Sequence, residues 1–188
     1  MGRREEKKEE TRRRIVEAAE ELHATVGFAN ATISAVALRA GVERLTVYRY
    51  FPTEKELVAA CAVHFFSLHP LPDPRRWAPV RSPRRRLRAA LTELYAYYGR
   101  TEANMANFVR DVSLVPFLPE IGAPMWRAFG EYRETLARGW HVRGRRRAEL
   151  LAAVGHALDF GTWRSLVRQQ GLEDAQAVEL MVRLVRSI

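Results

Sequence analysis

Apolar residues recur at intervals of three and four along most of the chain, which is the period of an amphipathic α-helix. Proline and glycine interrupt this pattern and mark the ends of the periodic segments. No segment alternates apolar and polar residues strongly enough to compete with the helical signal. The pattern therefore predicts an all-α protein of about nine helices, over residues 11–26, 33–40, 44–51, 54–68, 83–99, 102–114, 124–138, 145–169 and 175–187.

Helix-capping residues divide the chain into parts. Residues 1–10 are mostly charged and predict a flexible tail. Thr32 is a suitable N-cap for the second helix, and Gly41 allows a tight turn after it. We expect a helix-turn-helix domain over residues 11–53 and a second helical domain over residues 54–188.

The segment "GVERLTVYRYF" at residues 41–51 crowds three large aromatics and an arginine behind a glycine. Val47 and Phe51 are four residues apart and share the inward face of a helix. The other face is suited to DNA, since arginine binds guanine and tyrosine hydroxyls bind phosphates. The candidate contacts are Thr32, Arg44, Leu45, Thr46, Tyr48, Arg49 and Tyr50. In the alternative interpretation, the two tyrosine rings simply pack against the neighbouring helices.

The stretch "TISAVALRAGVERLTVYRYFPTEKELVAAC" resembles the N-terminal DNA-binding domain of the tetracycline-repressor (TetR) family, over about residues 11–61. The resemblance implies a homodimer, a recognition helix in the major groove, a ligand-responsive C-terminal domain and, by default, repression. The family often has a phosphate-binding lysine three residues after the phenylalanine. Here that position is Glu54, and whether Lys55 takes the role is left open.

The last two helices carry apolar stripes that favour a dimer interface, a four-helix bundle formed by two chains. The residues expected there are Leu158, Leu166, Ala177, Leu180, Met181 and Leu184. A two-fold dimer predicts a palindromic operator. The alternative is that these stripes form the chain's own core.

The middle of the chain is rich in large aromatic residues with a few polar ones among them, a composition typical of small-molecule sites. The expected pocket residues are His64, Phe65, Tyr95, Tyr98, Met105, Phe108, Arg110, Trp126, Phe129 and Phe160. We expect a hydrophobic or aromatic effector with a polar group near His64 or Arg110. Ordinary core packing is the alternative for any single aromatic residue.

The charge balance favours a polyanionic partner. Lys and Arg number 31 against 22 Asp and Glu, a formal net charge of +9. Many of the excess arginines lie in residues 75–88 and 143–147, where we interpret them as solvated surface. The single cysteine and the lack of a long apolar run predict a cytoplasmic protein that neither forms disulfides nor binds membranes. Neither a cofactor nor a metal is expected.

Two other classes of function remain as alternatives. A helical enzyme would use Cys61 as a nucleophile with His64 on the same helical face, and His156 with Asp159 could bind a metal. Neither pair is part of a complete catalytic or metal-binding set. An architectural DNA-binding protein would have the same helix-turn-helix and a tightly packed C-terminal core that binds no ligand.

Overall fold

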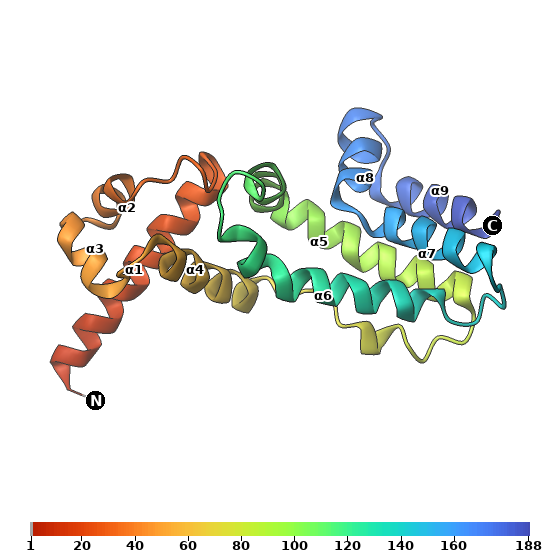
Figure 1. The fold of residues 1–188 in the computed structure, drawn as a ribbon, viewed down its shortest axis with the longest axis horizontal. Coiled ribbons are helices and arrows are strands. Elements are labelled where there is room, and N and C mark those ends of the chain that lie inside the picture. Colours follow the sequence, from red (N-terminus) through yellow and green to blue (C-terminus); the bar gives the residue numbers. More distant parts are fainter. Residues whose placement is uncertain (1) are drawn as a thin grey trace. The chain divides into compact units, whose positions relative to one another are not determined.

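The computed structural model describes residues 2–188, and its regular secondary structure over that range consists only of helices (Figure 1). The prediction of an all-α chain is therefore confirmed. The elements are α1 (Arg3–Thr25), α2 (Ile33–Ala40), α3 (Arg44–Tyr50), α4 (Glu54–Leu68), η1 (Pro74–Arg76), α5 (Pro83–Asp111), α6 (Leu118–Ala137), α7 (Arg145–Leu158), α8 (Phe160–Arg164), η2 (Ser165–Gln169) and α9 (Asp174–Arg186). None of the described helices is long and apolar enough to cross a membrane.

The chain forms two compact units. The first unit comprises the chain up to Pro70 together with Glu102–Gly122, and the second comprises Leu71–Thr101 with Ala123–Ile188. Helices α5 and α6 therefore each contribute to both units. This division differs from the boundary expected near residue 53, because α4 and the end of α5 belong to the first unit.

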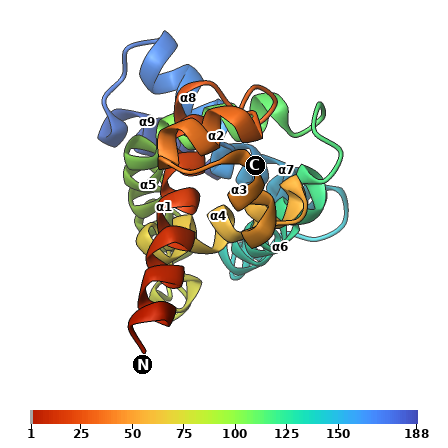
Figure 2. The same ribbon diagram turned by 90° about the vertical axis from the view of Figure 1, so that its left-hand side faces the viewer.

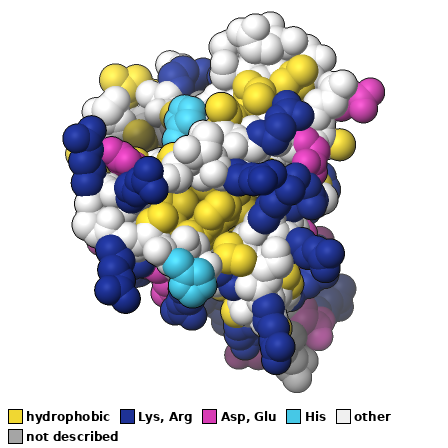
Figure 3. Space-filling view, turned by 90° about the vertical axis from the view of Figure 1, so that its right-hand side faces the viewer, with side chains coloured by type: hydrophobic (Ala, Val, Ile, Leu, Met, Phe, Trp, Pro, Cys, Tyr) yellow, Lys and Arg dark blue, Asp and Glu magenta, His cyan; other side chains and the backbone are white. Residues whose placement is uncertain are grey.

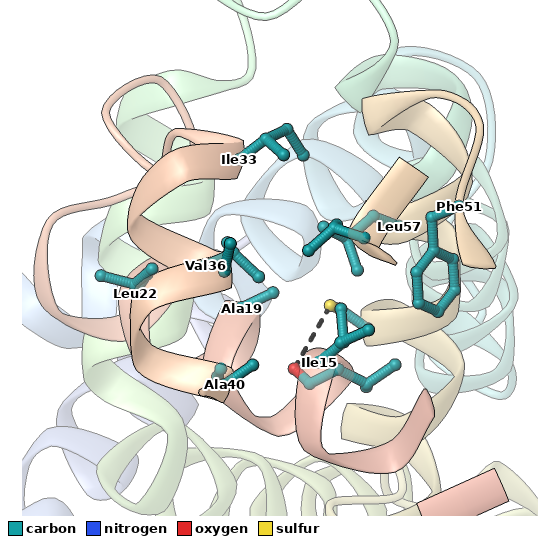
Figure 4. Packing of buried hydrophobic residues seen from close by; sticks show 13 residues of the cluster. Ile15, Ala19, Leu22, Ile33, Val36, Ala40, Phe51 and Leu57 are labelled. Carbon is teal, nitrogen blue, oxygen red and sulfur yellow. Dashed lines mark hydrogen bonds between the residues drawn. The ribbon is translucent and has the colours of Figure 1, made fainter. Parts of the chain in front are cut away.

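The core of the first unit is small and mostly aliphatic (Figure 4). Helix α1 contributes Ile15, Ala19 and Leu22 at helical spacing, and all three are buried. The other labelled side chains come from α2, the end of α3 and α4: Ile33, Val36, Ala40, Phe51 and Leu57. Small alanines between larger residues let these short helices approach closely, which is what a helix-turn-helix requires.

Helix α1 begins earlier than expected. Residues 3–10, assigned to a flexible tail from their charge, form its first turns, and residue 1 lies outside the described residues. Charged side chains three and four apart support such a solvated helix, as in the Arg13–Glu17 pair at 3.6 Å. All side chains of residues 3–10 are exposed, so these turns extend beyond the core.

Helix α5 is continuous from Pro83 to Asp111, and the predicted interruption at residues 99–101 is wrong. Tyr95, Tyr97 and Tyr98 are buried just before Gly99. A glycine inside a helix costs about 1 kcal/mol, whereas burying one large side chain contributes about 1.5–3 kcal/mol. Tertiary packing therefore overrides the local helix-breaking signal.

The predicted helix over 145–169 is also wrong, because it is interrupted at Asp159. This residue has an extended backbone, with φ −72° and ψ 135°, and its carboxylate accepts a hydrogen bond from the Thr162 amide at 3.2 Å. Asp159 thus serves as the N-cap of α8. Helix α6 starts before the expected residue 124 and accommodates Pro124 in its interior.

The second unit has an aromatic core. The largest fully buried side chains in it include Trp77, Trp163, Tyr95, Tyr98 and Tyr132. Buried tyrosines need partners for their hydroxyl groups. Tyr95 and Tyr98 donate to the carbonyl oxygens of Ala157 and Leu158, at 2.9 and 2.5 Å. These bonds attach α5 to the end of α7.

Candidate nucleic-acid interface

Helices α2 and α3 follow one another across a short turn (Figure 2). Backbone conformation and one arginine hold this turn. Gly41 has φ 63° and ψ 42°, a left-handed conformation that glycine adopts without strain. The Val42 amide donates to the Ala37 carbonyl at 3.0 Å. The Arg14 guanidinium on α1 donates to the Ala40 carbonyl. These contacts set the angle at which α3 leaves α2.

Helix α3 has one buried and one solvated side. Val47 is fully buried, and Phe51, directly after the helix, is 3% exposed. Both therefore face inward, as their spacing predicts. Arg44, Leu45 and Arg49 lie on the exposed side, and the Leu45 side chain is 73% exposed. An exposed apolar side chain between two arginines is suited to a base methyl group rather than to water.

The two tyrosines of α3 combine both interpretations of the sequence. Tyr48 and Tyr50 are partly buried and pack against the core of the first unit. Tyr48 also accepts a hydrogen bond from Arg44 Nη2 at 3.2 Å, with the guanidinium 5.5 Å from its ring centroid. Arg44 and Tyr48 thus form a pre-oriented pair on the exposed side. Thr46 is likewise only partly exposed.

Thr32 is the N-cap of α2, as expected. Its side-chain oxygen accepts a hydrogen bond from the Ala35 amide at 3.2 Å, and the residue is exposed. The hydroxyl hydrogen remains available to donate to a phosphate oxygen, next to the positive end of the helix dipole. Leu38 on the same helix is 85% exposed, and it is not among the contacts expected from the sequence. The sequence signal for it is that it does not share the helical face of the buried residues of α2.

Lys55 has an acidic neighbour that the sequence did not reveal. Its Nζ lies 2.6 Å from Glu120 Oε2, in the first turn of α6 and within the same unit. Both side chains are largely exposed, so the pair is weak and exchangeable. A phosphate could therefore compete with Glu120 for Lys55.

Comparison with known proteins agrees with this geometry. Residues 15–61 match the model for bacterial regulatory proteins of the tetR family. These residues therefore form a DNA-binding domain of the TetR family. The matched residues are those that form the helix-turn-helix and its supporting helices, so the match supports DNA binding by this part of the chain. Curated protein sequences give no significant match.

Solved structures share the fold over nearly the whole chain. A TetR-like transcriptional regulator from Rhodococcus sp. RHA1 is 19% identical, with a TM-score of 0.66 and 93% of each chain covered. AibR, solved with isovaleryl coenzyme A and operator DNA, is 16% identical, with a TM-score of 0.68 and 93% and 97% covered. PfmR from Thermus thermophilus is 15% identical, with a TM-score of 0.62 and 91% and 96% covered.

The polar residues expected in the effector pocket already have partners in the first unit. His64 Nδ1 lies 2.9 Å from the Glu20 carboxylate, and burial raises the pKa of Glu20 while His64 opposes that shift. Arg110 donates to Asp111 at 2.7 Å and holds the pKa of that buried carboxyl below its usual value. The Asp111 carboxylate also accepts from the Ala29 amide at 3.2 Å. These groups stabilise the unit itself.

The aromatic residues expected in the pocket fall into both units. In the first unit, Phe108 contacts Phe28 edge to face at 6.0 Å, Phe65 contacts His69, and Met105 is buried. In the second, Tyr98 and Phe160 pack 5.3 Å apart beside Tyr95, while Trp126 is 47% exposed and lies 6.5 Å from Phe129. Within the second unit, the structure brings together Tyr95, Tyr98 and Phe160.

The expected dimer stripe of α9 is partly occupied by the chain's own core. Leu158, Ala177 and Met181 are buried within the second unit. Leu180 and Leu166 are only partly buried, and Leu184 is 51% exposed. The apolar surface that remains for a partner is thus narrower than the sequence pattern indicates.

The arginine runs lie on the surface, as interpreted. Figure 3 shows Lys and Arg side chains spread between apolar side chains over one face of the molecule. Residues 143–147 are all exposed. Arg86 is the exception at 5% exposed, and its guanidinium donates to the carbonyls of Val80 and Arg138.

The residues considered for catalysis are held in structural contacts. Cys61 is 3% exposed, and burial raises the pKa of its thiol far above the ordinary value. Its Sγ donates weakly to the Val16 carbonyl at 3.6 Å, the dashed line of Figure 4. His156 lies 3.2 Å from the Thr162 hydroxyl while Asp159 caps α8. No group of three potential metal ligands occurs within residues 2–188.

Proposed function

We propose that this TetR-family protein is a transcriptional repressor that binds a palindromic operator as a homodimer and is released by a small hydrophobic effector. The observation that supports DNA binding is the exposed side of α3. Leu45 and Arg49 are exposed there, whereas Val47 on the opposite side is buried in the core. Arg49 forms no ion pair with any described residue, so its guanidinium remains available to a guanine edge.

Phosphate contacts position the helix in the groove. Thr32 supplies a hydroxyl at the start of α2, and the Arg44–Tyr48 pair presents a cation beside a phenol. Lys55 takes the role of the family's phosphate-binding lysine when it leaves Glu120. Contacts of this kind fix register and orientation, while Thr46, Arg49 and Leu45 read the bases.

Dimerisation uses the exposed apolar side of α9, with Leu180 and Leu184 four residues apart and Leu166 contributed by η2. A two-fold dimer places the two α3 helices on successive major grooves, about 34–36 Å apart. The operator is accordingly a palindrome whose half-sites are about one helical turn apart or a multiple of it.

Release from the operator depends on α5, a helix that contributes to both units. Helix α5 begins in the second unit and ends in the first, where Asn107 donates to the carbonyls of His23 and Ala24 at 2.8 Å. Asp111 binds the loop that follows α1. An effector that shifts α5 in the second unit moves the segment that holds the C-terminal end of α1, and with it the reading helix. Full switching needs about 5.5 kcal/mol of differential binding.

Selection of bound fragments from the source genome, at two salt concentrations, tests the DNA-binding part. We expect one palindrome to survive the higher salt. Arg49→Ala should weaken its binding about 5- to 150-fold, whereas Arg143→Ala, which removes the same charge from the second unit, should leave sequence preference intact. Equal losses in both variants, or enrichment of no sequence, would mean that net charge alone drives binding.

A further inference from the structure

The second unit contains two buried hydrogen-bond donors that have no partner of good hydrogen-bond geometry among the described residues. They are the indole nitrogen Nε1 of Trp77 and the hydroxyl of Tyr97, and each side chain is 1% exposed. Arg86 Nε is the third such atom, but its guanidinium makes two other hydrogen bonds. The hydroxyls of Tyr95 and Tyr98, by contrast, both donate to carbonyls. Burial raises the pKa of Tyr97 and the Thr101 side chain lowers it, but Thr101 donates its own hydroxyl hydrogen to the Tyr97 carbonyl at 2.9 Å.

Unpartnered donors of this kind are rare in folded proteins, because each loses its hydration without gaining a hydrogen bond. Two in one core are therefore unexpected in a unit that satisfies its other tyrosines. For Tyr97, phenylalanine would fill nearly the same space without the hydroxyl, so packing alone does not require that polar atom. A hydrogen-bond acceptor from outside the chain would satisfy both atoms.

One aromatic cluster connects the two donors. The Trp77 ring meets the Tyr132 ring edge to face, with centroids 5.0 Å apart. Tyr97 is close enough to Tyr132 that its charge would raise the pKa of that phenol. Arg76, next to Trp77, forms an ion pair with Glu93 of α5, with 3.5 Å between nitrogen and oxygen. Glu93 lies one helical turn before Tyr97. Tyr132 in turn donates to the Pro72 carbonyl at the start of the loop that carries Trp77, at 2.5 Å.

We propose that Trp77 Nε1–H and the Tyr97 hydroxyl form the polar end of the effector site and bind a hydrogen-bond acceptor oxygen of a neutral, largely apolar ligand. The aromatic rings around them contact the ligand's apolar body. This inference rests on the proposed function. It moves the polar recognition away from His64 and Arg110, whose polar atoms are already paired.

The charges around the cluster favour a neutral ligand. Burial and Tyr97 raise the pKa of Tyr132 most, and Asp73, Glu131 and Glu93 add to the shift. Asp73 and Glu93 are themselves paired with Arg75 and Arg76, so the charges around the cluster largely cancel. Burial raises the pKa of Tyr97 to about 12, which keeps its hydroxyl protonated and able to donate. A ketone, ester or amide oxygen therefore fits better than a carboxylate.

Three probes of one shape test this assignment on the full chain. They are 2-acetylnaphthalene, 2-ethylnaphthalene and 2-naphthoate, which carry a neutral acceptor, no acceptor and an anion. The readout is the set of four tryptophan indole signals in a proton–nitrogen NMR spectrum, with Trp77 assigned by Trp77→Phe. We expect the ketone to move the Trp77 signal at lower concentration than either other probe. No preference for the ketone would overturn the proposal.

Tyr97→Phe and Tyr95→Phe form a matched pair, each lacking one hydroxyl from α5. Tyr97→Phe should weaken ketone binding about 2- to 10-fold, leave the hydrocarbon unaffected, and leave Tm unchanged or higher, because its hydroxyl has no partner to lose. Tyr95→Phe loses the bond to Ala157 and should lower Tm by about 2–5 °C. An equal loss of Tm in both variants would show that the Tyr97 hydroxyl is satisfied within the protein, which contradicts the proposal.

DNA binding by the same samples separates the two proposals. Specific operator binding that both variants retain, together with no ketone preference, defeats only the assignment of the polar end. Absence of specific DNA binding in the unaltered protein defeats the proposed function, whatever the probes do.

Discussion

The two units bury different kinds of side chain. The first has a core of isoleucine, valine, leucine and alanine, with Phe51 as its fully buried ring. The second buries tyrosines and tryptophans, and three of the tyrosine hydroxyls donate to backbone carbonyls of distant segments. An aliphatic core needs only shape and spacing, whereas an aromatic core with polar tips also needs hydrogen-bond partners.

The same difference separates the roles of the tyrosines. Tyr48 and Tyr50 lie half-buried at the surface of the first unit, where we propose that their hydroxyls bind DNA. Tyr95, Tyr97 and Tyr98 are buried in the second, where the hydroxyls of Tyr95 and Tyr98 join two helices and that of Tyr97 is the proposed ligand donor. Four changes test this contrast, from the largest expected effect to the smallest.

Tyr98→Ala should have the largest effect, a loss of about 3–5 kcal/mol of unfolding free energy. Its ring packs against Phe160 and Trp163, and its hydroxyl bonds Leu158. Urea unfolding measures the loss. Leu45→Ala, which truncates an exposed side chain of the first unit, should stay within about 0.5 kcal/mol. A loss below about 1 kcal/mol for Tyr98→Ala would contradict the picture of an aromatic core that stabilises the second unit.

His23 should make the stability of the first unit depend on pH. Burial lowers its pKa from 6.5 to about 4, and its ring stacks on Phe28 at 4.4 Å. The unfolded chain therefore binds the proton more tightly, so stability is full above pH 6.5 and falls by about 3 kcal/mol as pH drops toward 4.

Comparison with His23→Phe isolates this effect, since the variant keeps the ring and cannot titrate. Glu20, whose pKa burial raises, shifts stability in the opposite direction across part of this range, so the difference between the two proteins is the quantity to measure. Parallel curves of stability against pH would show that His23 is not the titrating group.

Gly41→Ala should destabilise the helix-turn-helix by about 1–2 kcal/mol, because its φ of 63° strains any residue with a Cβ. The control is Gly130→Ala in α6, where an added Cβ meets nothing within 4 Å. That change should stabilise the second unit by about 0.5–1 kcal/mol. Thermal unfolding compares them, and equal shifts of Tm would refute the conformational role of Gly41.

Glu120→Gln should have the smallest effect. It frees Lys55 and should tighten operator binding by up to about fivefold, the value of one exposed ion pair. The control, Glu134→Gln, releases Arg147 in the second unit with the same change of net charge. If both changes tighten binding equally, Lys55 has no special role at the phosphate.

Local signals predicted most of the first unit. Thr32 and Thr53 are N-caps and Gly41 is a C-cap in the structure, as their residue types predict. Val47 and Phe51 face inward, as their spacing predicts. The ion pair between Lys55 and Glu120 was not predictable, because the two residues are 65 positions apart. The same holds for the pairing of His64 with Glu20, which removes a polar group expected in the effector pocket.

The sequence by itself determined the all-α architecture, the helix-turn-helix and the exposed side of its reading helix, since these depend on side-chain period and on caps within a few residues. Only the tertiary structure decided that α5 passes through Gly99, that a break falls at Asp159, and that Ala177 and Met181 belong to the chain's own core. It also decided which buried donors lack partners. Burial and hydrogen bonds between distant segments outweigh local preferences of about 1 kcal/mol, and one-dimensional patterns do not contain those contacts.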